Sequence, residues 1–461
     1  MVRLLNKSLK IKTMLKQLLP LFLLISFTVS GQHFVKGKVE PISKENNWII
    51  LYQLKGAKQL YIKNATITNG EFKIDFPENS SSGMYRLMYD MRNKGYVDFI
   101  YNNENIELEF NRETPSTTLN FLVSEENKIY NEYTIKTSEI RQQLDSVQLL
   151  FFRLTDTNEQ LKSQKIYTSL LLQKNNLQTN FEQLSKGKLV NSFIYASNKY
   201  YAKSLINNPQ AYLNSEKKHY FDFINFEDDN LKSSSFFSEK IIDYVFYLNR
   251  SEDVEVQNVL YKNAVNEVMQ KVGNHQLLKS ELLTTLLYTF AQVENVGLID
   301  FILESYYKKL PKELIDLNVI KDIQLKVKLA IGKYAPEITW NENGITKNLS
   351  ELNNAEEYMV IFWSTSCSHC LNEIPKLYEY TKDKPKIHVI AIALEMNDVE
   401  FKKQTQNMTK WTNILGLKKW ENPIAREYEI NVTPTYFILD ATKKIISKPY
   451  YFENVKEFFE H

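Results

Sequence analysis

Short runs of apolar residues alternate with turn-forming residues from position 34 to about position 110. The runs are rich in β-branched and aromatic residues and cover residues 48–54, 71–76, 84–89 and 106–110. Asn69 and Gly70 stand between two further runs, and both tolerate the positive φ angles of a two-residue hairpin turn. The pattern predicts a small all-β sandwich or barrel of six or seven strands, with a hairpin at Asn69-Gly70.

A helical pattern replaces this alternation between residues 121 and 330. This span holds only three glycines and two prolines, the residues that most often interrupt helices, so long helices are expected. Apolar residues with the three- and four-residue spacing of a one-sided helix are Leu278, Leu282, Leu286, Phe290 and Val293. The sequence shows no 34-residue repeat and no sustained heptads, and it indicates no function for this region.

The pattern changes again near residue 335. Continuous apolar runs typical of buried strands cover residues 360–363, 387–394 and 436–439, and helical segments between them include residues 370–382 and 399–408. This order predicts βαβ units and a largely parallel sheet. The chain is therefore predicted to be multidomain, with an all-β domain at residues 33–120, a helical region at residues 121–332 and an α/β domain at residues 333–461.

The first 32 residues have the composition of an export signal. Several lysines precede an apolar stretch at residues 18–29, which has the length of a signal-peptide core and is too short to span a bilayer. Ser30 and Gly31 fit the small-residue rule for cleavage before Gln32, and Met14 is an alternative start. An uncleaved anchor helix is the alternative interpretation. We expect a periplasmic chain of the cell envelope, soluble or membrane-associated only through an uncleaved signal.

Charge and composition narrow the classes of function. The chain carries 57 basic and 55 acidic residues, a formal net charge of +2, which gives no electrostatic sign of nucleic-acid binding. Six histidines and two cysteines leave little material for a metal site. We therefore expect no nucleic-acid partner, no metal and no cofactor.

The two cysteines, Cys367 and Cys370, are separated by two residues. The loop that they would close is too small to stabilise a large fold, so redox chemistry or metal binding is the expected role. They follow a buried strand and open a helix, whose N-terminus stabilises a thiolate. Cys367 is predicted to be the nucleophile and Cys370 the resolving thiol. An imidazolium at His369 would favour the thiolate further and tune its redox behaviour.

The segment from Phe362 to Cys370 resembles the active-site segment of thioredoxin-fold proteins, closest to the exported TlpA/ResA-like thiol–disulfide oxidoreductases. Cys370-Leu371-Asn372-Glu373-Ile374-Pro375 is similar to the C-x-x-E-x-P of that group. The resemblance implies that Glu373 assists proton transfer at the cysteines. It covers about residues 333–461, and the β-domain is similar to one that often precedes such modules.

Thr433-Pro434 resembles the segment whose proline is cis and faces the cysteines, and in this family the residue before that proline pairs its backbone with substrate. The resemblance implies that Trp363, Thr433 and Pro434 shape a substrate groove, with Trp363 as floor packing. Ser366 stands where the family usually has tryptophan. Ile361 stands where thioredoxin has a buried aspartate, so Glu373 is the nearby carboxylate candidate.

The resemblance implies a thiol–disulfide oxidoreductase, acting as a reductase on protein disulfides and supplied by a membrane electron donor. Ser368 and His369 between the cysteines favour oxidation instead, so the redox direction stays open. An exported interaction protein with an accessory thioredoxin module is the alternative from a different class. Metal binding by the cysteines lacks an evident fourth ligand. A peroxiredoxin signature fails because Val360 stands where that signature needs a proline, although Ser364 would fit it.

Overall fold

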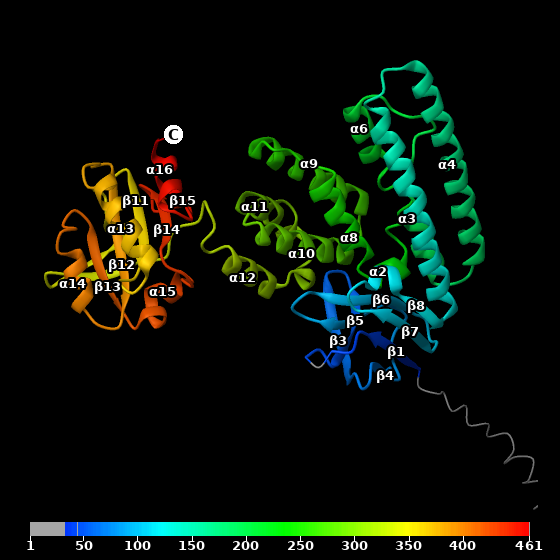
Figure 1. Ribbon diagram of the computed structural model, residues 1–461, viewed down its shortest axis with the longest axis horizontal. Helices are drawn as coiled ribbons and strands as arrows, with labels where there is room; N and C mark the ends of the chain where they lie inside the picture. The colour runs from blue at the N-terminus through cyan, green and yellow to red at the C-terminus, as the bar shows by residue number, and fades with distance from the viewer. Residues whose placement is uncertain (1–32, 44, 461) are drawn as a thin grey trace, which may run out of the picture. The chain divides into compact units, whose positions relative to one another are not determined.

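The computed structural model describes residues 33–43 and 45–460 (Figure 1). The chain divides into two compact units, one ending at Ser235 and the other beginning at Phe236. This boundary falls inside the predicted helical region of residues 121–332, so each unit holds some of its helices. The predicted export signal at residues 1–32 lies outside the described residues. Within the described part of the chain, no helix has the length and apolar character needed to cross a membrane.

The first unit begins with a sandwich of two four-stranded sheets. One sheet has the order β4-β1-β7-β8 and the other the order β3-β2-β5-β6. Neighbouring strands are antiparallel except β1 and β7, which are parallel. The span predicted to hold six or seven strands holds seven: β1 (Phe34–Glu40), β2 (Trp48–Lys55), β3 (Lys58–Thr66), β4 (Glu71–Asp75), β5 (Gly83–Asp90), β6 (Gly95–Tyr101) and β7 (Ile106–Asn111). A further strand, β8 (Asn120–Val123), follows that span and completes the first sheet.

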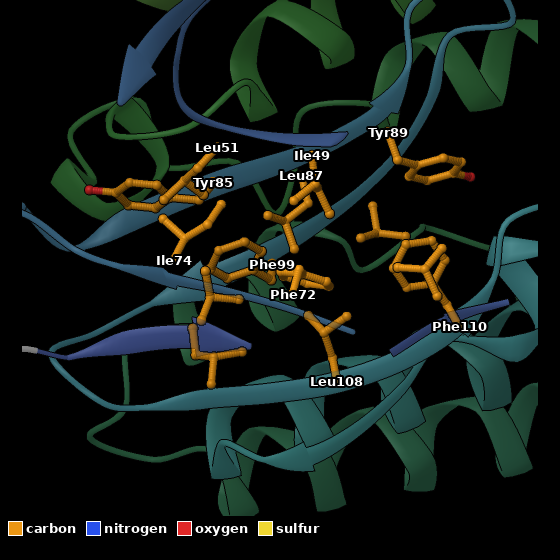
Figure 2. Close-up of a cluster of buried hydrophobic side chains, with 14 of the residues drawn as sticks. Ile49, Leu51, Phe72, Ile74, Tyr85, Leu87, Tyr89, Phe99, Leu108 and Phe110 are labelled. Carbon is orange, nitrogen blue, oxygen red and sulfur yellow. The ribbon is translucent and has the colours of Figure 1, made fainter. Parts of the chain in front are cut away.

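Side chains from both sheets meet in the core of this sandwich (Figure 2). Every second residue of β5 is buried, as expected for a strand with one face on a core. Ile49 and Leu51 of β2 and Leu108 of β7 are completely buried in the same cluster. Each such side chain contributes about 1.5–3 kcal/mol by leaving water, so this apolar alternation is what holds the two sheets together.

The turn predicted at Asn69-Gly70 is present, but it does not join two strands of one hairpin. Both residues have positive φ, 53° and 84°, and Thr68 and Glu71 exchange backbone hydrogen bonds of 2.9 and 3.0 Å across the turn. Beyond this residue pair, β3 pairs with β2 and β4 pairs with β1. The predicted hairpin is therefore wrong, because the turn carries the chain from one sheet to the other.

Two long helices, α3 (Glu125–Phe151) and α4 (Thr157–Leu184), follow the sandwich and pack side by side (Figure 1). Ser124 and Asp156 cap their first turns by accepting backbone hydrogen bonds from Asn127 and Glu159. Shorter helices complete the first unit: α2 (Pro115–Thr118), α5 (Val190–Ala196), α6 (Pro209–His219) and α7 (Asp229–Lys232).

The second unit begins with the remaining helices of the helical region. They are α8 (Phe236–Ile242), the π-helix η1 (Asp243–Tyr247), α9 (Val254–Val272), α10 (Gln276–Gln292), α11 (Val296–Ser305) and α12 (Leu317–Lys326), with short 3-10 turns η2 (Tyr307–Lys309) and η3 (Lys312–Leu314). The apolar stripe predicted along α10 is buried at Leu278, Leu282, Leu286 and Phe290. Val293 is 60% exposed, so its inclusion in the stripe is wrong: α10 ends one residue before it.

A five-stranded mixed sheet forms the C-terminal domain, in the order β13-β12-β11-β14-β15. β11 (Glu357–Trp363), β12 (Ile387–Glu395) and β13 (Thr412–Leu417) are parallel, whereas β14 (Thr435–Asp440) and β15 (Ile445–Ser447) are antiparallel. Helices α13 (Ser368–Thr381) and α16 (Phe452–Glu460) pack on one face, and α15 (Pro423–Glu427) packs on the other. The predicted multidomain order of β-domain, helical region and α/β domain is confirmed.

The remaining elements of this domain are short. They are β9 (Thr339–Glu342) and β10 (Ile345–Asn348), which pair as a hairpin, α14 (Val399–Thr405), and the 3-10 turns η4 (Leu349–Glu351) and η5 (Lys419–Glu421). Helix α14 ends at Thr405, three residues before the predicted end at residue 408.

Candidate functional site

Cys367 and Cys370 lie where β11 passes into α13. Cys367 is the N-cap residue of α13, and its sulfur accepts a hydrogen bond from the Cys370 amide at 3.2 Å. Both are free thiols, but Cys367 is only partly buried whereas Cys370 is completely buried. The helix therefore begins at Ser368, two residues earlier than predicted, because the first cysteine itself caps it.

The two thiols have opposite shifts in pKa. Burial opposes ionisation of Cys367, but hydrogen bonds donated by the Cys370 thiol and amide outweigh it, so the pKa of Cys367 lies below its ordinary value of 9.0. The positive end of the α13 dipole acts in the same direction. Burial raises the pKa of Cys370 to about 12. At neutral pH Cys367 is therefore the better nucleophile, and Cys370 keeps its proton until a base removes it.

The loop before β14 brings Thr433 and Pro434 to the cysteines. The Cys367 thiol donates to the Thr433 carbonyl oxygen, with a sulfur–oxygen distance of 3.4 Å. The Thr433–Pro434 peptide bond is cis. The contact places backbone atoms of this loop next to the Cys367 sulfur.

Glu373 is a buried carboxylate one helical turn beyond Cys370 in α13, and it is only 6% exposed. Its Oε2 atom accepts a hydrogen bond of 2.6 Å from the hydroxyl of Tyr436 in β14. Its Oε1 atom lies 3.3 Å from Nε2 of His369. Glu373 and Cys370 are three residues apart in α13, and residues with this spacing lie on the same side of a helix. The carboxylate is therefore on the side of the helix that carries the Cys370 thiol.

The imidazole of His369 lies against Glu373 and Tyr451. The His369 and Tyr451 rings are perpendicular, with centroids 6.2 Å apart. The backbone amide of His369 makes a smaller contribution than that of Cys370 to lowering the pKa of Cys367. Direct tuning of the thiolate by the imidazole remains a prediction.

Trp363 is 1% exposed and packs in the same apolar cluster as Cys370. Its indole thus lies beneath the cysteines, as expected for floor packing. A contribution of Trp363 to the shape of the substrate groove stays a prediction.

Residues 356–445 match the model of a family described as thioredoxin-like. The C-terminal domain of this chain belongs to the thioredoxin-like family. The match spans the strands β11–β14 and the whole constellation of Cys367, Cys370, Glu373 and Tyr436 described above.

Several solved structures are similar to parts of this chain. A domain of a possible thiol-disulfide isomerase from Cytophaga hutchinsonii is 30% identical over 29% of this chain and 92% of its own, with a TM-score of 0.25. The thioredoxin domain of a thiol-disulfide oxidoreductase from Bacteroides vulgatus is 26% identical over 28% of this chain and 98% of its own, with a TM-score of 0.24. A thioredoxin-like protein from Bacteroides caccae is 17% identical over 57% of this chain and 97% of its own, with a TM-score of 0.30. No curated protein matches the chain.

Two residues of the thioredoxin-like site were not among the candidates from the sequence. Tyr436 was placed in a strand but given no role, and its partner Glu373 is 63 residues away in the chain. Glu395, 6% exposed, ends β12 and accepts hydrogen bonds from the Thr365 amide at 2.5 Å and the Ser364 hydroxyl at 3.2 Å. Glu395 could have been found from the sequence, because it lies at the carboxyl end of a predicted parallel strand. Ligands and functional groups gather at this end of the strands in α/β sheets.

Hydrogen bonds with Glu395 and Lys419 hold the loop between β11 and Cys367. Glu395 binds its start, and the Cys367 amide donates to the Ser364 carbonyl oxygen at 3.2 Å. Ser366 accepts a hydrogen bond of 3.2 Å from Lys419 Nζ. Across the described residues, no group of three or more His, Cys, Asp or Glu side chains is placed to hold a metal ion.

Proposed function

We propose that this protein is a thiol–disulfide oxidoreductase that exchanges electrons with protein disulfides through Cys367 and Cys370. The observation that carries the proposal is the unequal pair at the start of α13. One sulfur is accessible and has a lowered pKa, and the other is buried and has a raised pKa. An attacking thiolate and a shielded resolving thiol are what dithiol exchange needs.

The exchange begins when the Cys367 thiolate attacks one sulfur of a partner disulfide. The partner's S–S bond breaks, and its other sulfur leaves as a thiolate that takes up a proton. Glu373 then accepts the proton of Cys370, and the Cys370 sulfur attacks Cys367. The Cys367–partner bond breaks, and the partner's second sulfur leaves as a thiolate that also takes up a proton. The partner has gained two electrons and two protons, and the protein holds a Cys367–Cys370 disulfide. Thr433 and Pro434 position the partner's chain beside Cys367.

We further propose that the protein works as an exported, periplasm-facing reductase, with a membrane donor that returns two electrons after each cycle. The export-signal pattern at residues 1–32 and the resemblance to TlpA/ResA-like proteins support this assignment. His369 is proposed to adjust the redox behaviour of the site.

The redox equilibrium of the cysteine pair against glutathione tests the function and its direction. Trp363, in the same cluster as Cys370, supplies a fluorescence signal. A potential near about −270 mV supports a reductase with an upstream donor, and a value above about −180 mV supports an oxidant or isomerase. The absence of a reversible couple refutes the enzyme proposal. Cys370→Ser should trap partner proteins as mixed disulfides on Cys367, and Cys367→Ser is the matched variant that should trap none.

A second candidate function is binding by the β-domain, with the thioredoxin-like domain as an accessory. A surface cavity of about 710 Å³ in this domain favours it, lined among others by Tyr89, Tyr96 and Arg112. That volume is in the range of ligand sites, roughly 300–1,000 Å³. A Cys367→Ser/Cys370→Ser double variant discriminates, because a cellular role that survives the loss of both thiols belongs to the binding domains.

A further inference from the structure

A chain of side chains leads from the buried cysteine to the surface of the thioredoxin-like domain. Tyr436, 1% exposed, holds Oε2 of Glu373 at 2.6 Å, and Nε2 of His369 lies 3.3 Å from Oε1. Side-chain exposure rises from 7% at Glu373 to 50% at His369. One oxygen of the carboxylate is therefore fixed in the interior, and the other contacts a ring that water reaches.

The contacts of Glu373 with Tyr436 and His369 offer a route for the proton of Cys370 to leave the interior. Cys370 is completely buried, so its proton cannot pass directly to water when it attacks the mixed disulfide. Glu373 can accept that proton, but the carboxylate is itself buried and needs an outlet before the next cycle. Imidazole gains and loses a proton near neutral pH more readily than any other side chain, and His369 places one between Glu373 and solvent.

We propose that His369 passes the proton of Cys370 from Glu373 to water, and that Tyr436 is a positioning residue that holds the carboxylate for this transfer. The inference rests on the proposed thiol–disulfide exchange. The proton leaves the Cys370 sulfur for Glu373, moves from Oε1 to Nε2 of the neutral imidazole, and is released to water. No electron moves in this relay, and the carboxylate and the neutral ring are restored.

Three parts of the domain contribute groups to the surroundings of the relay. Cys367 and Cys370 belong to the start of α13, Tyr436 comes from β14, and Tyr451 precedes α16 and packs its ring edge-on to His369. The pKa of Tyr436 is raised by burial and by its hydrogen bond to Glu373, so its hydroxyl stays protonated and acts as a donor.

Single-turnover oxidation of the reduced full chain by glutathione disulfide separates the two steps. The first glutathione is released when Cys367 forms the mixed disulfide, and the second is released when Cys370 resolves it. We expect His369→Ala to slow the second release about 10-fold more than the first at neutral pH, less than the loss of a direct general base would cost. Added imidazole should restore the second release, because the removed ring was half exposed.

Tyr436→Phe should also slow the second release, because it removes the hydrogen bond that positions the Glu373 carboxylate. Added imidazole should not restore the rate, because His369 is still present in this variant. Tyr428→Phe is the matched control: it removes a buried hydroxyl that donates to the Pro336 carbonyl oxygen at 2.6 Å on the opposite face of the sheet. We expect it to leave both releases unchanged.

A second release at the wild-type rate in His369→Ala would overturn the inference and leave the proposed function intact. A slow second release that imidazole fails to restore would overturn it as well, because a purely structural role of the ring predicts that result. If the unmodified chain releases no glutathione, the proposed function itself is refuted, and the relay with it.

Discussion

Replacing Tyr436 by phenylalanine removes one hydroxyl from the interior of the thioredoxin-like domain and leaves the ring in place. The ring is 1% exposed and packs in the cluster that contains Cys370, so its apolar contacts survive the change. What is lost is the 2.6 Å hydrogen bond to Glu373, a carboxylate that is itself 6% exposed. The variant therefore isolates one buried interaction.

The expected magnitude depends on the charge of the acceptor. A hydrogen bond to a charged group contributes about 1.5–3 kcal/mol to stability, against about 1 kcal/mol for a neutral pair. We expect Tyr436→Phe to lower the free energy of unfolding by about 2 kcal/mol if Glu373 is ionised. Tyr428→Phe, which removes a bond of the same 2.6 Å length to a neutral carbonyl, should cost about 1 kcal/mol.

Urea unfolding followed by tryptophan fluorescence measures both losses. Trp340, Trp363, Trp411 and Trp420 lie in the C-terminal domain, four of the five tryptophans of the chain, so the signal reports mainly on this domain. Equal losses in the two variants would refute the argument that Glu373 is a buried charge held by Tyr436. A gain in stability in Tyr436→Phe would show that the carboxylate is protonated and satisfied without the hydroxyl.

Iodoacetamide should alkylate Cys367 in the reduced chain with a half-maximal rate below pH 9.0, because the pKa of this thiol is lowered. It should spare Cys370, which is completely buried. Peptide mass spectrometry measures the alkylation of each cysteine, and equal alkylation of the two would contradict the prediction. Glu395→Ala should lower the free energy of unfolding by about 2 kcal/mol, since the Thr365 amide loses its buried acceptor, while Glu395→Gln, which keeps an oxygen there, should cost less in the same urea titration. Burial lowers the pKa of Lys174 from 10.5 to about 8, so the unfolded chain binds more protons between these values and stability should rise with pH across them. The gain is about 3 kcal/mol, and circular dichroism should show that Lys174→Met lacks it; an unchanged pH dependence in the variant would exclude this assignment.

Patterns between neighbouring residues were enough to predict the parts of the site that depend on local structure. The apolar run at residues 360–363 lies in β11, and the cysteines lie at the start of α13 as expected. The role of Tyr436 depends instead on the register of β14, which places it opposite Ile361, and on a contact with Glu373 across 63 residues. No local pattern encodes such a register.

The difference between local patterns and long-range contacts also explains why two predictions about the fold were wrong. Asn69 and Gly70 favour a tight turn wherever they occur, and the turn is there, but the choice of strand partners follows from which faces two sheets bury together. Val293 continues the spacing of the α10 stripe, yet spacing alone does not show where the helix ends.

The unequal burial of the two sulfurs also decides what an oxidant does to this domain. We expect hydrogen peroxide to convert the partly exposed Cys367 thiolate to a sulfenic acid and to spare Cys370, which is completely buried. The Cys370 thiol then condenses with that sulfenic acid, releases water and forms the intramolecular disulfide. Oxidative damage at the nucleophile thus ends in a form that thiols can reduce, before irreversible sulfinic acid accumulates.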